Sequence, residues 1–322
     1  MKEIDKLLSI EEFLTDKEWG ITPPSLYEPI QYIMSLGGKR LRPMLTLMGY
    51  SLFEKDIERI APYAAAVEVF HNFTLMHDDI MDKAPLRRGK KTVHEKWNVN
   101  TAILSGDVML VKVYEIFSSL EPKLLKEALP LFNACATEVC QGQQLDMEFE
   151  QKKTVTTSEY LEMIRQKTAV LLGFSLELGG LLAGAKPKER LALKNLGMNM
   201  GIGFQLNDDL LDVYGDQKKF GKQVGGDIIS NKKTFLLIRA LERAKGKDKA
   251  ELLKWTNAKT FDKIKKVKAV TAIYNKLGIP QLTETEINNY FSKGLKDLSS
   301  LSPSKDRDKL GQFIFSLMKR QK

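Results

Sequence analysis

The chain has 322 residues, a formal net charge of +9 and a 43% hydrophobic fraction. That length accommodates one large domain or two ordinary ones, with enough apolar residues for a sizeable core. Two cysteines are too few for a disulfide framework or for a four-ligand structural zinc site. The basic surplus is compatible with a solvated surface, a nucleic-acid footprint or a site for anionic substrates.

Targeting and membrane-spanning segments are not expected. The N-terminal sequence MKEIDKLLSIEEFL is acidic and amphipathic, unlike the basic start and unbroken apolar run of a signal peptide. No uncharged apolar stretch reaches the roughly 20 residues that span a bilayer. We therefore expect a cytoplasmic protein without a transmembrane segment.

Helical periodicity dominates the chain. Apolar residues recur at helical spacing over 60–76, 101–120, 124–149, 158–183, 188–213 and 232–244. Alternating strand patterns are scarce, and no low-complexity linker divides the chain. We predict an all-α protein, a single domain over residues 1–322 with ten or more helices.

Two aspartate-rich turns each end an apolar run. HDDIMD contains Asp78, Asp79 and Asp82, and NDDLLD contains Asp208, Asp209 and Asp212. On a helix, positions i and i+4 share a face, where like charges are destabilising. Magnesium would neutralise them, because it commonly takes one or two carboxylates plus substrate phosphates. One such turn alone could equally be a solvated acidic patch, but two copies favour metal ions with an anion between them.

Basic residues accompany both acidic turns. They lie in GGKRLRP at 37–43, in RRG at 87–89, at Lys167 beside Thr168, in FGKQVGGD at 220–227 and in NKKT at 231–234. Glycines let a backbone approach a ligand closely, and lysine and arginine suit phosphate oxygens. Each segment alone is more often a surface loop. Their alternation with acidic turns favours a metal–diphosphate pocket.

The ordered set of motifs resembles the trans-isoprenyl diphosphate synthases, also called polyprenyl synthetases. GGKRLRP, ExxH at Glu68–His71, DDIMD, RRG, GQQLD at 142–146, KT at 167–168 and GIGFQLNDDLLD at 201–212 occur in the family's order. The resemblance implies an isoprenoid synthase fold, an all-α bundle around a deep central cavity, usually assembled as a homodimer. After RRG the family usually has a proline two residues on, whereas this chain has Lys90 and Lys91. The shape of this loop is therefore not implied by the resemblance.

The resemblance also implies the reaction. An allylic diphosphate (dimethylallyl, geranyl or farnesyl) condenses with isopentenyl diphosphate, and diphosphate leaves. Magnesium and fixed cations stabilise the charge that develops as the C–O bond breaks. The double bond of isopentenyl diphosphate then attacks the allylic cation, and released diphosphate is the implied base.

Residue roles follow from the same resemblance. Asp78 and Asp82 would bind Mg²⁺ at the allylic diphosphate with Asp79 in support, and Asp208 a further ion near Asp209 and Asp212, about three ions in all. The implied isopentenyl diphosphate ligands are Lys39, Arg42, His71 and Arg88. The implied allylic diphosphate site contains Arg87, Lys167, Thr168, Gln205, Lys222 and Lys232. Lys167, Thr168, Gln205 and Asp209 form the implied catalytic set, with Thr168 and Gln205 near the allylic cation.

His71 could instead be an ordinary core histidine, as a lone histidine on an apolar helix usually is. It lies seven residues before Asp78, about two helical turns, and therefore on the same helix face. That placement, together with the ExxH match, favours the substrate role.

Product length is expected to depend on the helix that carries DDIMD. Phe73 and Thr74 lie five and four positions before Asp78, where the resemblance makes bulky residues a floor for the growing chain. Phe70 lies one turn below. This combination favours fifteen- or twenty-carbon products, with geranylgeranyl diphosphate slightly preferred. A buried helical aromatic is otherwise simply core.

Three alternatives remain. A class I terpene cyclase would usually carry a different second metal motif and would ignore isopentenyl diphosphate. A non-catalytic partner subunit of a heteromeric synthase would commonly have lost aspartates. A nucleic-acid binder would show steeply salt-dependent affinity, and two acidic turns argue against it, so no nucleic-acid partner is expected.

Overall fold

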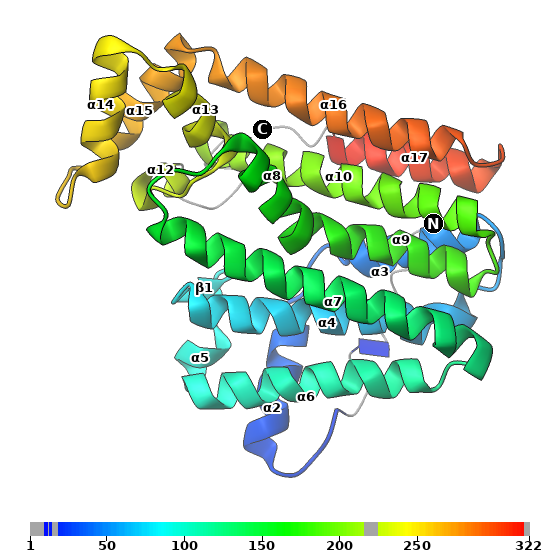
Figure 1. Cartoon of the computed structure of the whole chain (residues 1–322). Coiled ribbons are helices and arrows are strands. Elements are labelled where there is room, and N and C mark those ends of the chain that lie inside the picture. The colour runs from blue at the N-terminus through cyan, green and yellow to red at the C-terminus, as the bar shows by residue number, and fades with distance from the viewer. Residues whose placement is uncertain (1–9, 12, 15–18, 216–224, 319–322) are drawn as a thin grey trace. The chain divides into compact units, whose positions relative to one another are not determined.

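The computed structural model describes residues 10, 11, 13, 14, 19–215 and 225–318. Within them, helices follow one another along the chain (Figure 1). The α-helices are α2 (Pro24–Ser35), α3 (Leu41–Ser51), α4 (Ala61–Met81), α5 (Val93–Lys96), α6 (Val99–Ser118), α7 (Pro122–Gln151), α8 (Thr157–Ile164), α9 (Val170–Leu182), α10 (Pro187–Tyr214), α12 (Gly226–Ser230), α13 (Phe235–Arg243), α14 (Gly246–Asn257), α15 (Lys263–Lys276), α16 (Ile279–Ser299) and α17 (Lys305–Met318). Strands β1 (Leu86–Arg87) and β2 (Lys90–Lys91), the 3₁₀ turn η1 (Glu58–Ile60) and the π-helical turn η2 (Arg165–Ala169) complete the described elements. The predicted all-α class with ten or more helices is confirmed.

Two predicted helices differ from the observed ones. The segment 158–183 is not one helix, because the π-helical turn η2 separates α8 from α9. The segment 232–244 becomes helical only at Phe235. Thr234 is the N-cap residue of α13, and Lys232 lies in the preceding loop. Apolar periodicity revealed neither the local change of helix type nor the first residue of the helix.

The chain divides into two compact units. Unit 1 comprises Met1–Ala134 and Phe174–Lys194, and unit 2 comprises Cys135–Gly173 and Asn195–Lys322. Each acidic turn belongs to a different unit. The expectation of a single domain over 1–322 stays a prediction.

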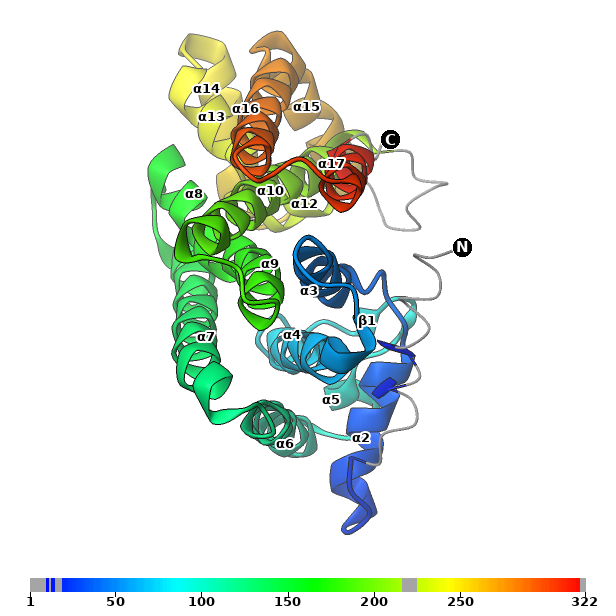
Figure 2. The ribbon, with the colours of Figure 1, turned by 90° about the vertical axis from the view of Figure 1, so that its right-hand side faces the viewer.

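Unit 1 is built around α4, which packs against α2, α3 and α6 (Figure 2). Its alanine-rich first half suits a helix, and Ala64, Ala65 and Ala66 are fully buried. Further along, the ring of Phe70 lies 5.1 Å from that of Phe132 on α7. Each such buried side chain contributes about 1.5–3 kcal/mol, so the core of unit 1 holds the helix that ends in the first acidic turn.

Unit 2 contains the second acidic turn near the end of α10. Phe291 of α16 is buried, and its ring packs against Gly203 of α10. A Cβ added to Gly203 would lie only 2.9 Å from that ring. Asn199 of α10 also donates a hydrogen bond to Asp297 of α16, at 3.2 Å. These contacts with α16 hold the middle of α10 just before the NDDLLD turn.

None of the helices in the described ranges combines the length and the apolar character needed to cross a bilayer.

Candidate active site

The first acidic turn ends α4. Asp78 and Asp79 lie in its last turn, and Asp82 is the C-cap residue, with φ −79° and ψ −5°. Asp79 is buried, Asp78 is half-buried and Asp82 is exposed. The three predicted metal carboxylates therefore lie together in sequence and space but differ in their access to solvent.

Asp79 is bound by arginine. Arg87 donates from Nε to Oδ2 and from Nη2 to Oδ1 of Asp79, both at 2.7 Å. The same guanidinium lies 3.9 Å from Asp78. Burial raises the pKa of Asp79, although the arginine acts in the opposite direction. Asp79 is thus an anchor for Arg87, and its expected role beside the metal stays a prediction.

Arg87 and Arg88 lie in a tight hairpin. In β1 and β2, Leu86 pairs with Lys91 and Arg87 with Lys90, antiparallel. Both connecting residues, Arg88 and Gly89, have positive φ, of 52° and 75°, as a type I′ hairpin turn requires. Lys90 and Lys91, the two residues at which the sequence departs from the family pattern, therefore take part in the strand pairing.

The GGKRLRP loop meets this hairpin. A Cβ on Gly38, whose φ is 144°, would lie 2.8 Å from Nη2 of Arg88. The positive φ favours glycine there, and any side chain would have to displace the tip of the Arg88 side chain. Lys39 is exposed and Arg42 is half-buried. Lys39 therefore lies in the loop before α3, Arg42 in the first turn of α3 and Arg88 in the hairpin turn. The loop and the hairpin approach each other at Gly38 and Arg88.

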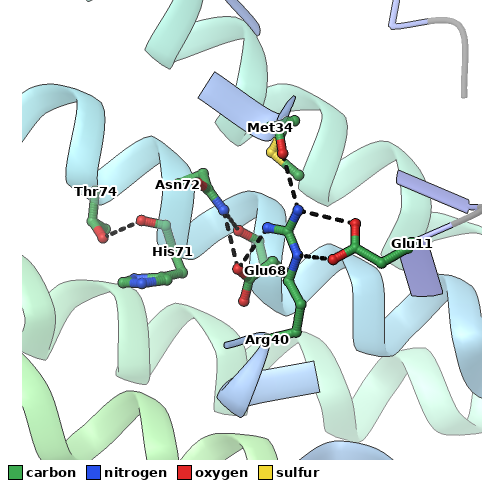
Figure 3. A network of polar contacts seen from close by, with 7 residues as sticks. All are labelled: Glu11, Met34, Arg40, Glu68, His71, Asn72 and Thr74. Atoms are coloured by element: carbon green, nitrogen blue, oxygen red, sulfur yellow. Dashed lines mark hydrogen bonds and ion pairs between the residues drawn. The ribbon is translucent and has the colours of Figure 1, made fainter. Parts of the chain in front are cut away.

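Arg40, between Lys39 and Arg42, is held in the interior (Figure 3). Its guanidinium donates to both carboxylate oxygens of Glu11, at 2.7 and 3.1 Å, and to Glu68 Oε1 at 3.0 Å. It also donates to the Met34 carbonyl at 2.9 Å. The Arg40 side chain is only 2% exposed. This arginine therefore fixes the loop to α4 and cannot serve as a substrate ligand.

His71 follows Glu68 by three residues on α4 (Figure 3). Burial, followed by the charges of Arg42, Arg87, Arg88 and Arg40, holds its pKa well below the usual value. The imidazole is accordingly neutral near pH 7. A neutral ring among four arginines marks a strongly electropositive region, which suits a polyanionic ligand.

The second acidic turn lies near the end of α10. Asp208 is exposed, Asp209 is buried and Asp212 is half-buried. Tyr160 of α8 donates a short hydrogen bond to Asp209, and Gln205 Nε2 donates another to it at 3.2 Å. Burial raises the pKa of Asp209 to about 6, against these hydrogen bonds. Asp209 is thus an internal carboxylate that orients Gln205.

The π-helical turn η2 presents Lys167 and Thr168. Thr168 Oγ1 donates to Gln205 Oε1 at 3.2 Å. A hydrogen-bonded series therefore runs from Thr168 through Gln205 to Asp209, which brings three of the four predicted catalytic residues together. Single-turn π-bulges within helices frequently occur at functional sites.

Lys167 is held by Asp146 of α7. Its Nζ lies 2.6 Å from Asp146 Oδ2, and Lys232 Nζ lies 3.8 Å from the same oxygen. The two lysines keep the pKa of Asp146 below its ordinary value despite burial. A Cβ on Gly142 would lie 2.2 Å from the backbone nitrogen of Lys167, so the glycine allows α7 to approach η2 closely. Asp146 therefore brings two predicted allylic diphosphate ligands together.

Asp212 of α10 is hydrogen-bonded to the first turn of α12. Its Oδ2 accepts a hydrogen bond from the backbone N–H of Asp227 at 2.9 Å. Burial, together with Asp212 and Asp209, raises the pKa of Asp227 to about 7. Asp227 therefore adds a fourth carboxylate to this region. The predicted ligand Lys222 lies outside the described residues.

The donor set of both turns suits magnesium. Among the described residues, no three His, Cys, Asp or Glu side chains are grouped closely enough to hold a metal ion. Asp79, Asp209 and Asp212 already accept hydrogen bonds within the protein. Magnesium needs only one or two protein carboxylates when substrate phosphates supply the other ligands. The residues therefore fit magnesium shared with a bound diphosphate.

The predicted product-length residues lie on one stretch of α4. The ring of Phe73 lies 5.7 Å from that of Phe70 and 4.8 Å from His77. Thr74 Oγ1 donates to the His71 carbonyl at 2.8 Å. Phe70 is 1% exposed and Phe73 is 9% exposed. Phe70 is therefore firmly part of the aromatic core, and Phe73 is slightly more accessible.

Sequence reasoning assigned no role to four residues that hold candidate site side chains or their neighbours, namely Glu11, Asp146, Tyr160 and Asp227. Asp146 was visible within the GQQLD motif and Asp227 within FGKQVGGD, although no role followed from either. Glu11 and Tyr160 lie 29 and 49 positions from their partners Arg40 and Asp209. Only their contacts reveal them.

Comparisons with known proteins identify the family of the chain. The polyprenyl synthetase family model matches residues 23–274. A short chain isoprenyl diphosphate synthase of Methanocaldococcus jannaschii is 46% identical over 71% of this chain and 70% of its own length. A geranylgeranyl pyrophosphate synthase of Geoglobus acetivorans is 41% identical, covering 81% of this chain and 84% of its own. A crystal structure of a geranylgeranyl pyrophosphate synthase is 41% identical, with a TM-score of 0.95 and 99% of each chain covered. The chain belongs to the polyprenyl synthetase family.

Proposed function

We propose that the protein is a magnesium-dependent prenyltransferase that makes short-chain, all-trans prenyl diphosphates. It condenses isopentenyl diphosphate head-to-tail with an allylic diphosphate and releases diphosphate. The observation that carries the proposal is the neutral His71 surrounded by arginines on the helix that ends in Asp78 and Asp82. Such a site combines cations for phosphate oxygens with carboxylates for a divalent ion.

Isopentenyl diphosphate is held by Lys39, Arg42, His71 and Arg88. Lysine and arginine neutralise the diphosphate, and arginine does so through paired hydrogen bonds. The neutral imidazole of His71 donates one N–H to a phosphate oxygen without adding charge. Gly38 lies where the loop that carries Lys39 approaches the guanidinium of Arg88.

The allylic diphosphate is held by Arg87, Lys167, Lys222 and Lys232. Asp78, Asp82 and Asp208 would hold about three Mg²⁺ ions beside it. Asp79 and Asp146 act by orienting cations, Asp79 on Arg87 and Asp146 on Lys167 and Lys232. Bound magnesium would neutralise the departing diphosphate. Preoriented cations add to the effect, because they need no rearrangement as charge develops.

Thr168 and Gln205 face the developing allylic cation. Their oxygens are the negative ends of bond dipoles, so they stabilise positive charge without acting as nucleophiles. Asp209 fixes the amide of Gln205 by accepting from Nε2, which leaves Oε1 as the end that accepts from Thr168. The released diphosphate removes the proton in the last step.

The assembly proposed is a homodimer through α6. This helix exposes a row of large apolar side chains at helical spacing, formed by Val99, Ile103, Leu104, Val111 and Tyr114. Leu104 and Val111 are 58% and 61% exposed. Patches of this kind commonly mark protein–protein contacts. Sedimentation of the Leu104→Lys/Val111→Lys variant tests it, since the expected result is a monomer where the wild type is a dimer.

One assay tests the activity. Purified protein is incubated with Mg²⁺, isopentenyl diphosphate and each allylic diphosphate, and the chain lengths of the products are measured. Elongation to fifteen or twenty carbons supports the proposal, and excess chelator should abolish it. A terpene cyclase would leave isopentenyl diphosphate unused, and a non-catalytic subunit would be inactive alone.

A further inference from the structure

The basic surplus of the chain is concentrated in one hairpin. Residues 245–276 contain ten lysines against three acidic residues, a net charge of +7 within a chain whose total is +9. They form α14 and α15, which pack against each other within unit 2 (Figure 1). None of the proposed diphosphate ligands lies within this hairpin. The proposed activity therefore does not account for most of the net charge.

The lysines nearest the tip of the hairpin face solvent. Lys259, Lys263, Lys265 and Lys268 are exposed. Within the described ranges these four form no ion pair, whereas Lys276 is paired with Asp248 at 2.8 Å. Four exposed cations within ten residues make a strongly electropositive surface.

Folding gives no reason for this arrangement. Lys263, Lys265 and Lys266 lie in the first turn of α15, where the helix dipole is positive and cations are unfavourable. Lys266 alone is buried, and it donates to the Ile229 carbonyl and to Asn231 Oδ1 at 3.2 and 2.6 Å. The N-cap carboxylate of Asp262 accepts from the Lys265 backbone N–H at 3.0 Å and offsets part of this charge, but the ammonium groups of Lys263 and Lys265 form no ion pair among the described residues.

An apolar side chain stands among these cations. Ile264, between Lys263 and Lys265 and one turn before Lys268, is 79% exposed. Leu253, near the end of α14, is 41% exposed. Basic residues interleaved with exposed aliphatic ones are typical of protein surfaces that bind at the interface of an anionic bilayer.

We propose that the tip of the α14–α15 hairpin is a docking surface for anionic phospholipid membranes, with Ile264 entering the headgroup region. Charge complementarity supplies most of the attraction, since each lysine near such a surface strengthens binding about fivefold. A nucleic acid would satisfy the lysines but would offer nothing to Ile264. Release of an apolar product beside a bilayer would be the benefit, and that benefit rests on the proposed function, whereas the binding does not.

The test is co-sedimentation of the full-length protein with vesicles, without substrates. Vesicles of phosphatidylcholine alone are compared with vesicles containing about 30 mol % phosphatidylserine. The variant is Lys263→Glu/Lys265→Glu/Lys268→Glu, whose changes suit the start of a helix and should not harm folding. The control is Lys123→Glu/Lys126→Glu/Lys188→Glu, which removes the same charge from exposed positions in unit 1.

Binding is expected only to the anionic vesicles and should weaken as NaCl rises from about 0.05 to 0.5 M. The α15 variant should bind at least about a hundredfold more weakly, and the control should bind much more tightly than the α15 variant. Ile264→Ser should weaken binding severalfold. Both α15 variants should retain prenyl transfer to soluble substrates.

Four results would each overturn the proposal. They are an equal loss of binding in the α15 variant and the control, no preference for anionic vesicles, unchanged binding of Ile264→Ser, and tighter binding to duplex DNA than to vesicles.

Discussion

Arg87 and Asp79 form a two-point ion pair, with both N–O distances at 2.7 Å. Asp79 is the middle carboxylate of the first acidic turn, and its side chain is only 4% exposed. The Asp79 carboxylate is therefore buried against Arg87, and it holds the Arg87 guanidinium beside Asp78. One motif therefore contains both the proposed metal ligands and the anchor of Arg87, a proposed diphosphate ligand.

Replacing Asp79 by Asn should cost about 1–3 kcal/mol of unfolding free energy, because Arg87 loses its charged partner in a mostly buried place. It should also raise the KM for the allylic diphosphate more than that for isopentenyl diphosphate. Denaturant titration and steady-state kinetics measure the two effects. Arg59→Ala is the control, since its pair with Glu121 is exposed and contributes little. A stability unchanged from wild type would contradict the structural role of Asp79.

Replacing Asp146 by Asn should release Lys167 and Lys232 from their common partner. The KM for the allylic diphosphate is then expected to rise by about tenfold, as when one charge-assisted contact is lost. The KM for isopentenyl diphosphate should remain unchanged, and both are measured at saturating Mg²⁺.

Glu138→Gln provides the matched control for Asp146. Glu138 also lies on α7 and pairs with a basic residue of η2, since its Oε2 is 2.6 Å from Arg165. Arg165 is not among the proposed diphosphate ligands. An equal rise in KM for the two variants would mean that loss of any ion pair on α7 has this effect. The specific role of Asp146 in orienting Lys167 and Lys232 would then be wrong.

The pKa of His71 makes a prediction about stability and pH. Its native pKa lies well below the unfolded value of about 6.5. Below about pH 6.5 the unfolded state takes up a proton that the native state does not, so stability falls as pH falls towards the native pKa. His71→Asn lacks this penalty, which amounts to about 1.4 kcal/mol per pH unit.

The free energies of unfolding of wild type and His71→Asn should therefore converge as pH falls from 8 to 5, by about 2 kcal/mol. Denaturant titrations at both pH values measure the difference. The other two histidines are present in both proteins and cancel. A gap that stays constant with pH would show that the pKa of His71 is the same in the native and unfolded states.

How much the sequence reveals depends on the kind of signal. Apolar periodicity was enough for α4, α6 and α10, because one buried face must recur along a helix. The acidic turns were visible for the opposite reason, since carboxylates that follow a core helix need a partner. The π-helical turn at Lys167 was not visible, because it changes the hydrogen-bonding pattern without changing the apolar spacing.

The supporting residues of the site were beyond prediction for a different reason. Glu11 reaches Arg40 and Tyr160 reaches Asp209 across 29 and 49 positions of sequence. Nothing near either residue indicates its partner. The family resemblance gave roles to Lys39 and Arg42 and none to Arg40, but nothing in the sequence indicated that Arg40 is buried in ion pairs.

Phe73 makes a prediction about product length. Its ring contacts Phe70 below and His77 above on the same helix, and Asp78 follows His77 directly. A chain that grows from a diphosphate bound at Asp78 and passes along this face of α4 would meet Phe73 before Phe70. Phe73→Ala should then lengthen the product by at least one five-carbon unit, as measured by chromatography.

Phe291→Ala is the control for Phe73→Ala, because it removes an equally large buried ring from α16 in the other unit. Each truncation costs about 3–5 kcal/mol of stability, so both variants must first be shown to be folded. Only Phe73→Ala should change product length. If the two variants give the same products as wild type, Phe73 is core alone, and the limit on chain length lies elsewhere on the path.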